Sequence, residues 1–144
     1  MAYKLLTFIP PYRKSQFYQL MGHFFAERQY RHEYPYLINS EKTCWYIIID
    51  HHVIVRSFAS FEVKNSKIEI GEFYVSGNIK KKNMKQLLMK KILMDIKRDF
   101  PEATIEVSTS NLEEKELFEN KGFEVVRRTK NYFFLRKKGI KVYE

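Results

Sequence analysis

The stretch from residue 68 to residue 98 constrains the fold of this chain most, because the spacing of its apolar residues changes partway along. Residues 68–75 are rich in aromatic and β-branched side chains and are followed by Ser76-Gly77-Asn78, a pattern typical of a strand and a turn. From Lys82 onward the apolar residues recur at the period of a helix, at Met84, Leu88, Ile92 and Ile96. The sequence therefore predicts a strand, a lysine-rich turn and an amphipathic helix over residues 82–98.

Four lysines surround the expected start of this helix, namely Lys80, Lys81, Lys82 and Lys85. A helix N-terminus presents unpaired N–H groups and the positive end of the helix dipole, and both attract phosphate groups. Basic side chains at this end oppose the dipole, so helix stability does not explain them. We therefore expect an anionic ligand at this turn.

The charge of the whole chain also favours an anionic partner. The formal net charge is +9, and residues 73–144 hold seventeen of the 26 basic residues but ten of the 17 acidic ones. This excess indicates either a phosphorylated cofactor or nucleic acid. The alternative is a lysine-rich chain whose charges are solvated and bind nothing.

Composition predicts one packed domain over residues 1–144, since hydrophobic residues make up 44% of the chain and aromatic residues 16%. The single cysteine, Cys44, excludes a disulfide within the chain, and the beginning of the sequence lacks the apolar run of a signal peptide. No apolar stretch is long enough for a membrane span. We expect a cytoplasmic protein in which Cys44 is a small core residue, and the pair His51-His52 forms a turn rather than a metal site.

The other elements follow from local patterns, and residues 28–36 allow either a second short helix or an ordered loop. One helix should begin at a Ser15 cap and bury the aromatic residues between 17 and 25, and another should begin at Ser110-Asn111 and end at Lys121-Gly122. The expected strands cover residues 3–9, 43–50, 53–63, 104–107, 124–128 and 132–137. The expected fold is α+β.

Two motifs resemble those of the GNAT superfamily of CoA-dependent N-acyltransferases. The first is a spaced set near the C-terminus, made up of Val107, Asn111, Leu117, Phe118, Gly122 and Phe123. The second is the family's pyrophosphate loop, R/Q-x-x-G-x-G/A, in which Lys80 takes the first position while Asn83 and Lys85 take the small-residue positions. The resemblance implies a mostly antiparallel sheet flanked by helices, in which the strands at 68–75 and 104–108 are parallel and splayed apart.

The same resemblance implies acetyl-CoA as cofactor and suggests where it binds. The backbone of Phe73, Tyr74 and Val75 would pair with the pantetheine arm, and Asn111 would approach the pantetheine or thiol end. The pyrophosphate would lie against the turn formed by Lys80, Lys81, Lys82, Asn83, Met84 and Lys85. The Lys85 side chain either adds a charge to the phosphates or blocks them.

Phe118 occupies a position at which many members have a tyrosine that protonates the departing thiolate. Phenylalanine has no hydroxyl group and cannot do this. The departure predicts a slow enzyme rather than an inactive one, in which Phe118→Tyr keeps or raises turnover.

The acceptor amine needs a base, and the strand at 68–75 offers Glu69 and Glu72. Because side chains alternate between the two faces of a strand, only one of them should face the cleft. The alternative is that both glutamates only pair with Lys64 or Lys67. Three tyrosines are candidates for positioning the acceptor, namely Tyr34, Tyr36 and Tyr74.

The expected function is transfer of an acetyl group from acetyl-CoA to an amine of an unidentified acceptor. The alternative is a weakly active or inactive protein with the GNAT fold that binds nucleic acid or a protein partner. Its basic C-terminal half would do so, since Tyr and Phe alternate with Lys and Arg in residues 127–138.

Overall fold

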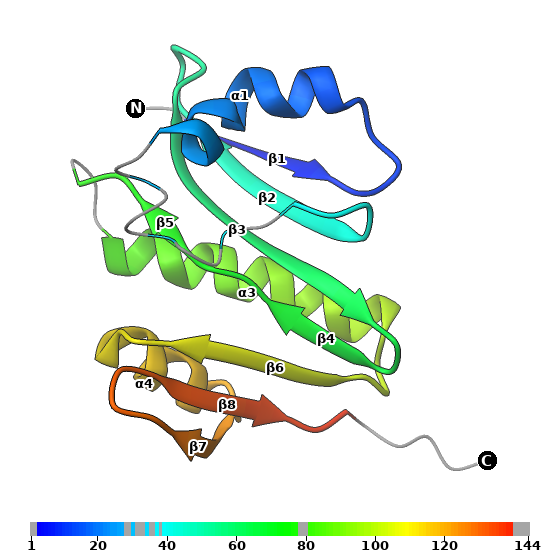
Figure 1. Ribbon diagram of the computed structural model, residues 1–144, viewed down its shortest axis with the longest axis vertical. Coiled ribbons are helices and arrows are strands. Elements are labelled where there is room, and N and C mark those ends of the chain that lie inside the picture. Colours follow the sequence, from blue (N-terminus) through cyan, green and yellow to red (C-terminus); the bar gives the residue numbers. More distant parts are fainter. Residues whose placement is uncertain are drawn as a thin grey trace.

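The computed structural model describes residues 3–27, 30, 34, 37, 39–77 and 81–139. The strands form one mixed sheet, and helices interrupt their succession along the chain (Figure 1). In order they are β1 (Lys4–Phe8), α1 (Lys14–Ala26), β2 (Thr43–Ile49), β3 (Val55–Lys64), β4 (Lys67–Ile70), β5 (Tyr74–Val75), α3 (Lys81–Asp99), β6 (Thr104–Thr109), α4 (Leu112–Asn120), β7 (Glu124–Arg128) and β8 (Phe133–Lys137).

The sheet has the strand order β1-β2-β3-β4-β6-β8-β7, with β5 beside β3. Its pairs are antiparallel except for β4 and β6, which run parallel in the register Lys67↔Thr104 to Ile70↔Val107. A parallel pair requires a crossover, and α3 provides it. The predicted α+β fold and its parallel pair are therefore confirmed.

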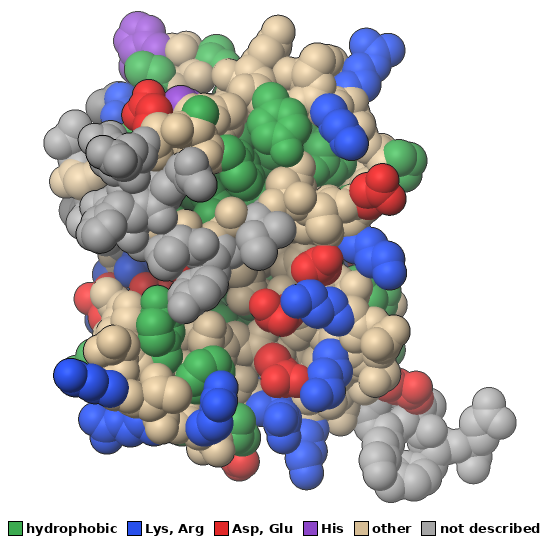
Figure 2. Space-filling view, in the orientation of Figure 1, with side chains coloured by type: hydrophobic (Ala, Val, Ile, Leu, Met, Phe, Trp, Pro, Cys, Tyr) green, Lys and Arg blue, Asp and Glu red, His purple; other side chains and the backbone are tan. Residues whose placement is uncertain are grey.

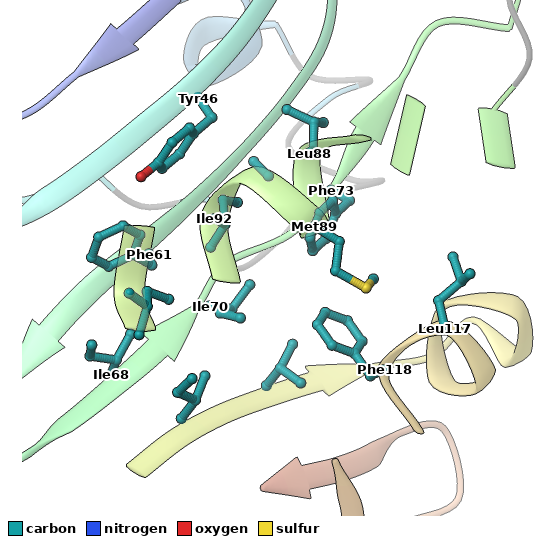
Figure 3. Close-up of a cluster of buried hydrophobic side chains, with 14 of the residues drawn as sticks. Tyr46, Phe61, Ile68, Ile70, Phe73, Leu88, Met89, Ile92, Leu117 and Phe118 are labelled. Atoms are coloured by element: carbon teal, nitrogen blue, oxygen red, sulfur yellow. The ribbon is translucent and has the colours of Figure 1, made fainter. Parts of the chain in front are cut away.

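Helices cover the sheet on two faces. On one face α1 buries Phe17, Met21 and Phe24 against Trp45 and Phe58 of the central strands. On the other face α3 and α4 bury a larger set of side chains, many of them drawn in Figure 3. Strand β2 contributes to both cores because its side chains alternate between the faces, as expected for an interior strand with apolar residues throughout.

The predicted continuous strand over residues 68–75 is wrong in its middle. The chain leaves the ladder after Ile70, and Gly71 donates its N–H to the Ser60 carbonyl oxygen at 2.8 Å. A Cβ at position 71 would overlap Ser60 Oγ, so glycine lets Ser60 keep its present conformation. The strand resumes as β5 against β3 alone.

The predicted Ser15 cap is also wrong. Helix α1 begins at Lys14, and Arg13 occupies the cap position without a side-chain hydrogen bond. The C-terminal signal of α4 is confirmed, since Gly122 follows the helix with a φ of 94°. The region predicted as a short helix or loop, residues 28–36, lies outside the described residues except for Tyr30 and Tyr34.

Candidate active site

Strands β5 and β6 diverge where the parallel pair ends. Beyond Ile70↔Val107 the chain turns toward β3, whereas β6 continues to Thr109 alongside β8. Helices α3 and α4 both begin at this end of the sheet (Figure 1). The predicted divergence is therefore present, and it opens a gap next to the starts of two helices.

A cavity of about 130 Å³ lies in this gap. Residues 69–73 form one wall and residues 107–110 form the other, with Tyr34, Glu114 and Tyr132 completing the lining. Among the described residues, polar side chains dominate the lining, which includes three carboxylates and no basic residue. Such a cavity suits a polar or cationic group better than an anion.

Both glutamates proposed as bases border the cavity, contrary to the expectation that only one would. The expectation assumed a regular strand, and the break at Gly71 removes the strict alternation of side chains between Glu69 and Glu72. Glu69 also accepts a hydrogen bond from Lys64 Nζ at 3.0 Å, and its side chain is 58% exposed. One oxygen of the Glu72 carboxylate is buried.

The side chain of Glu69 belongs to a charged row on the open face of the sheet. Glu69 lies opposite Glu62 on β3 and Glu106 on β6. Lys64 and Lys67 pair with this row, the latter through Glu106 Oε1 at 3.0 Å. Figure 2 shows acidic and basic side chains interleaved on this face. Glu69 thus has an ion-pair role of the kind foreseen in the alternative interpretation.

Strand β5 has one free edge among the described strands, because it pairs only with β3. The Tyr74 ring stacks on Phe58 with centroids 5.1 Å apart, and Ser57 Oγ donates to the Tyr74 carbonyl oxygen at 3.0 Å. Phe73 and Val75 are buried. Contacts with β3 therefore fix β5 on the side away from β6. This fits the prediction that an extended ligand pairs with residues 73–75.

The start of α3 is described only in part. Lys80 and the side chain of Lys81 lie outside the described residues, while Lys82 and Asn83 are exposed and Met84 is half-buried. Lys85 is buried, and its Nζ lies 3.1 Å from Glu114 Oε2. The ammonium group of Lys85 thus contacts α4 instead of extending from the surface of α3.

Burial raises the pKa of the Glu114 carboxyl group, and the neighbouring Lys85 ammonium offsets only part of that rise. The side chains of Lys85 and Glu114 are 11% and 13% exposed, so solvent screens their attraction weakly. The pair is therefore a contact shielded from solvent between α3 and the first turn of α4, in which the cost of burying the carboxylate exceeds the attraction of the ammonium group.

The two other residues implied by the family motif have structural contacts of their own. Asn111 caps α4, its Oδ1 accepting the Glu114 N–H at 2.9 Å. Phe118 is fully buried, with its ring 5.9 Å from that of Phe73 and 5.1 Å from that of Phe123. In Figure 3 it points toward Met89 of α3. Phe118 does not line the cavity.

Tyr132 and the segment 108–110 line the cavity although the sequence did not single them out. The register between β6 and β8 pairs Thr109 with Phe133, which brings the turn residue Tyr132 alongside Ser110. That neighbourhood depends on the order of strands in the sheet. A local sequence pattern carries no signal for it.

The remaining sequence candidates lie away from the cavity. Burial, with smaller contributions from Asp95 and Asp99, raises the pKa of the Cys44 thiol to about 11, so it is not a thiolate at neutral pH. His51-His52 forms a turn after β2. The described residues contain no cluster of three or more side chains suited to a metal ion. Within the same part of the chain, no helix is long and apolar enough to cross a membrane.

A mixed sheet whose one parallel pair separates beside the intervening helix defines an acyltransferase-type fold of the kind that the motifs imply. Residues 8–140 match the family model described as the acetyltransferase (GNAT) domain. The chain therefore belongs to the GNAT acetyltransferase family.

Solved structures with the same fold share little sequence with this chain. Escherichia coli ElaA has a TM-score of 0.72 at 15% identity, covering 95% of this chain and 100% of its own. An acyl-CoA N-acyltransferase from Pseudomonas aeruginosa has a TM-score of 0.72 at 13% identity, covering 94% and 99%. Campylobacter jejuni N-acetyltransferase PseH in complex with acetyl coenzyme A has a TM-score of 0.62 at 14% identity, covering 95% and 99%. A search of curated proteins found no match.

Proposed function

We propose that this protein transfers an acetyl group from acetyl-CoA to the amine of an acceptor. The observation that carries the proposal is the gap between β5 and β6, which opens beside the first turn of α3 and contains a cavity lined by carboxylates. Membership of the GNAT family supports the reaction class. A solved relative in complex with acetyl coenzyme A supports the choice of cofactor.

The described residues fit an extended thioester cofactor in two respects. The free edge of β5 offers backbone groups of residues 73–75 to a pantetheine arm, and the exposed Lys82 and Asn83 stand at the start of α3 for the phosphates. With the arm in the gap, the thioester end would point toward the cavity that Glu72 borders.

In the proposed reaction the acceptor nitrogen attacks the thioester carbonyl carbon, so that a C–N bond forms and the C–S bond breaks. We assign Glu72 as the base that removes a proton from the amine, because its carboxylate is partly buried at the cavity whereas Lys64 holds Glu69 on the open face. A backbone N–H near Val75 would polarise the carbonyl. With Phe118 in place of a tyrosine, the thiolate takes its proton from water or from the acceptor.

Positioning of the amine against the thioester would then supply most of the rate. Orientation contributes roughly 7–11 kcal/mol to barrier reduction, whereas a general acid or base typically contributes 10²–10⁴-fold. A site without the tyrosine therefore retains the larger part of its catalytic effect.

The test is acetyl-CoA consumption with a panel of polyamines, aminoglycosides, peptides and nucleobases. With an accepted amine, Glu72→Gln should lower kcat by about 10²–10⁴-fold and remove the limb of the pH profile due to the base. Glu69→Gln, the matched control, should change kcat only slightly. The assignment of the base is wrong if the control is the more damaged variant.

A second candidate function rests on the hairpin of β7 and β8. There the Arg127 guanidinium lies 4.0 Å from the Phe134 ring centroid, and that of Arg128 lies 5.1 Å from the Phe133 centroid. Cationic side chains can contact the phosphates of a single-stranded nucleic acid, and aromatic rings can stack on its bases. Tight CoA binding without turnover of any amine, together with salt-dependent binding of an RNA oligonucleotide, would favour this function.

A further inference from the structure

The ion pair between Lys85 and Glu114 connects the two helices that begin at the gap. Lys85 lies one turn before Leu88 and Met89 on α3, and Glu114 lies one turn before Leu117 and Phe118 on α4. Those four apolar residues pack in one core, where Figure 3 shows Met89 facing Phe118. The ion pair therefore lies next to this core, between the second turn of α3 and the first turn of α4.

Glu114 also borders the cavity between residues 69–73 and residues 107–110. The pair thus lies on the helix side of the gap through which we propose that the pantetheine arm runs. A ligand that placed its phosphates at the first turn of α3 and its arm in the gap would pass beside this pair.

Lys85 could exchange its hydrogen bond to Glu114 for one to a phosphate group. The Lys85 ammonium is a point charge on a flexible four-carbon stem, so it can turn toward any anion within reach. The first turn of α3, residues 81–84, immediately precedes it along the helix. A phosphate at that turn would offer Lys85 a charge-assisted hydrogen bond equivalent to the one that it makes with Glu114 at 3.1 Å.

We propose that Lys85 is a phosphate-binding residue that Glu114 holds in the absence of cofactor, so that cofactor phosphates compete with Glu114 for its ammonium group. The inference rests on the proposed function, since it takes the ligand to be CoA or acetyl-CoA. It explains how a lysine serves at a loop position where the family has a small residue. The side chain would add a charged phosphate ligand beside the N–H groups at the start of α3.

A consequence follows for ligand selection. A ligand with phosphates can release Lys85 from Glu114, whereas pantetheine, which has none, cannot. In the wild type, only molecules in which Lys85 is not paired with Glu114 can bind the phosphates through Lys85. The larger the paired fraction, the weaker the apparent affinity for CoA. Removing the charge of Glu114 should therefore favour CoA much more than pantetheine.

The test measures CoA binding by calorimetry and pantetheine binding by NMR titration. Glu114→Gln should tighten CoA binding by about tenfold, because the ion pair with Lys85 no longer has to be broken, and should change pantetheine binding much less. Lys85→Met should weaken CoA binding by a similar factor. In the double variant the gain from Glu114→Gln should be absent.

The matched control is Glu119→Gln on the same helix. Glu119 forms an exposed pair with Lys115, with Nζ 2.8 Å from Oε1, and its loss should change neither affinity. Binding of CoA can also be followed without substitution, since ¹⁵N-labelled Lys85 Nζ should shift with CoA but not with pantetheine. If a variant fails to fold, this measurement on the wild type still tests whether Lys85 contacts the phosphates.

Two outcomes would overturn the inference, and only the second would also overturn the proposed function. If wild type binds CoA and Glu114→Gln has the same affinity or a lower one, the pair is only a brace between helices. If neither wild type nor any variant binds CoA, the proposed function itself is wrong.

Discussion

Asp50 follows β2 directly and is buried, and its carboxylate accepts three hydrogen bonds. Its donors are the His52 N–H at 2.8 Å, the Ile54 N–H at 3.1 Å and Arg56 Nε at 2.8 Å. Burial alone would raise the pKa of Asp50, but these hydrogen bonds outweigh it and lower the pKa to about 2. The ionised carboxylate thus fixes the turn that contains both histidines.

The lowered pKa predicts a pH dependence of stability. An aspartate whose pKa is lower in the folded state contributes stability that is fully present above its unfolded value, near 3.9, and is lost as pH falls through about 2. Asp50→Asn should therefore lower Tm at pH 7, and the difference from wild type should shrink between about pH 4 and pH 2. Thermal unfolding followed by circular dichroism measures it.

Asp99→Asn is the control for this prediction. Asp99 also pairs with an arginine, Arg98, at 2.9 Å, but its side chain is 48% exposed. Its substitution should change Tm little at any pH. A difference for Asp50→Asn that stays constant with pH would mean that lost packing, and not the carboxylate charge, causes the destabilisation.

At the scale of elements, the break between β4 and β5 determines where the gap opens. Gly71 approaches Ser60 so closely that a Cβ would overlap Ser60 Oγ. At Gly71 the chain bonds to Ser60 of β3, and beyond Ile70 it pairs with β3 instead of β6. A glycine thus helps to end the parallel pairing.

We expect Gly71→Ala to destabilise the protein by about 1–3 kcal/mol, the usual cost of overpacking. Ser60→Ala in the same chain should recover most of this loss, because it removes the overlapped oxygen. Urea unfolding measures both. Gly77→Ala is the control, since a Cβ there meets no atom within 4 Å. An unchanged cost in the double variant would place the strain in the backbone instead.

The sequence predicted elements with strong local signals and missed those that depend on distant partners. The apolar period from Met84 to Ile96 located α3 to within a residue at each end, as Lys81–Asp99 against the expected 82–98. The contact of Lys85 with Glu114 joins residues 29 positions apart, and no local rule states it. The predicted Ser15 cap is wrong because α1 begins at Lys14, two residues earlier than a cap at Ser15 requires.

At the scale of the whole molecule, two cores share the same central strands. The single tryptophan, Trp45, lies in the core under α1, with its ring centroid 5.2 Å from that of Phe17. Its strand neighbour Tyr46 lies in the other core. Because adjacent residues of β2 belong to different cores, we expect the cores to unfold together as one domain.

Ile92→Val tests this from the core under α3, where Ile92 is fully buried. The loss of one methyl group should cost about 0.5–1.5 kcal/mol. The unfolding midpoint seen by Trp45 fluorescence, in the opposite core, should fall together with that seen by far-UV circular dichroism.

Leu87→Ala, on the same helix at a position that is 52% exposed, should shift both midpoints much less. Two separate midpoints in the Ile92→Val variant would contradict a single cooperative domain.

The open face of β4, β6 and β8 offers positions at which the sequence can diverge without changing the core. In β4 buried and exposed residues alternate strictly, and only Ile68 and Ile70 contribute to the core. Substitutions at Lys67 or Glu69 leave the core volume unchanged, so drift at such positions meets little selection for folding. Half of such a strand is thus free to adapt to new partners. A fold shared at 13–15% identity is the expected result of that freedom.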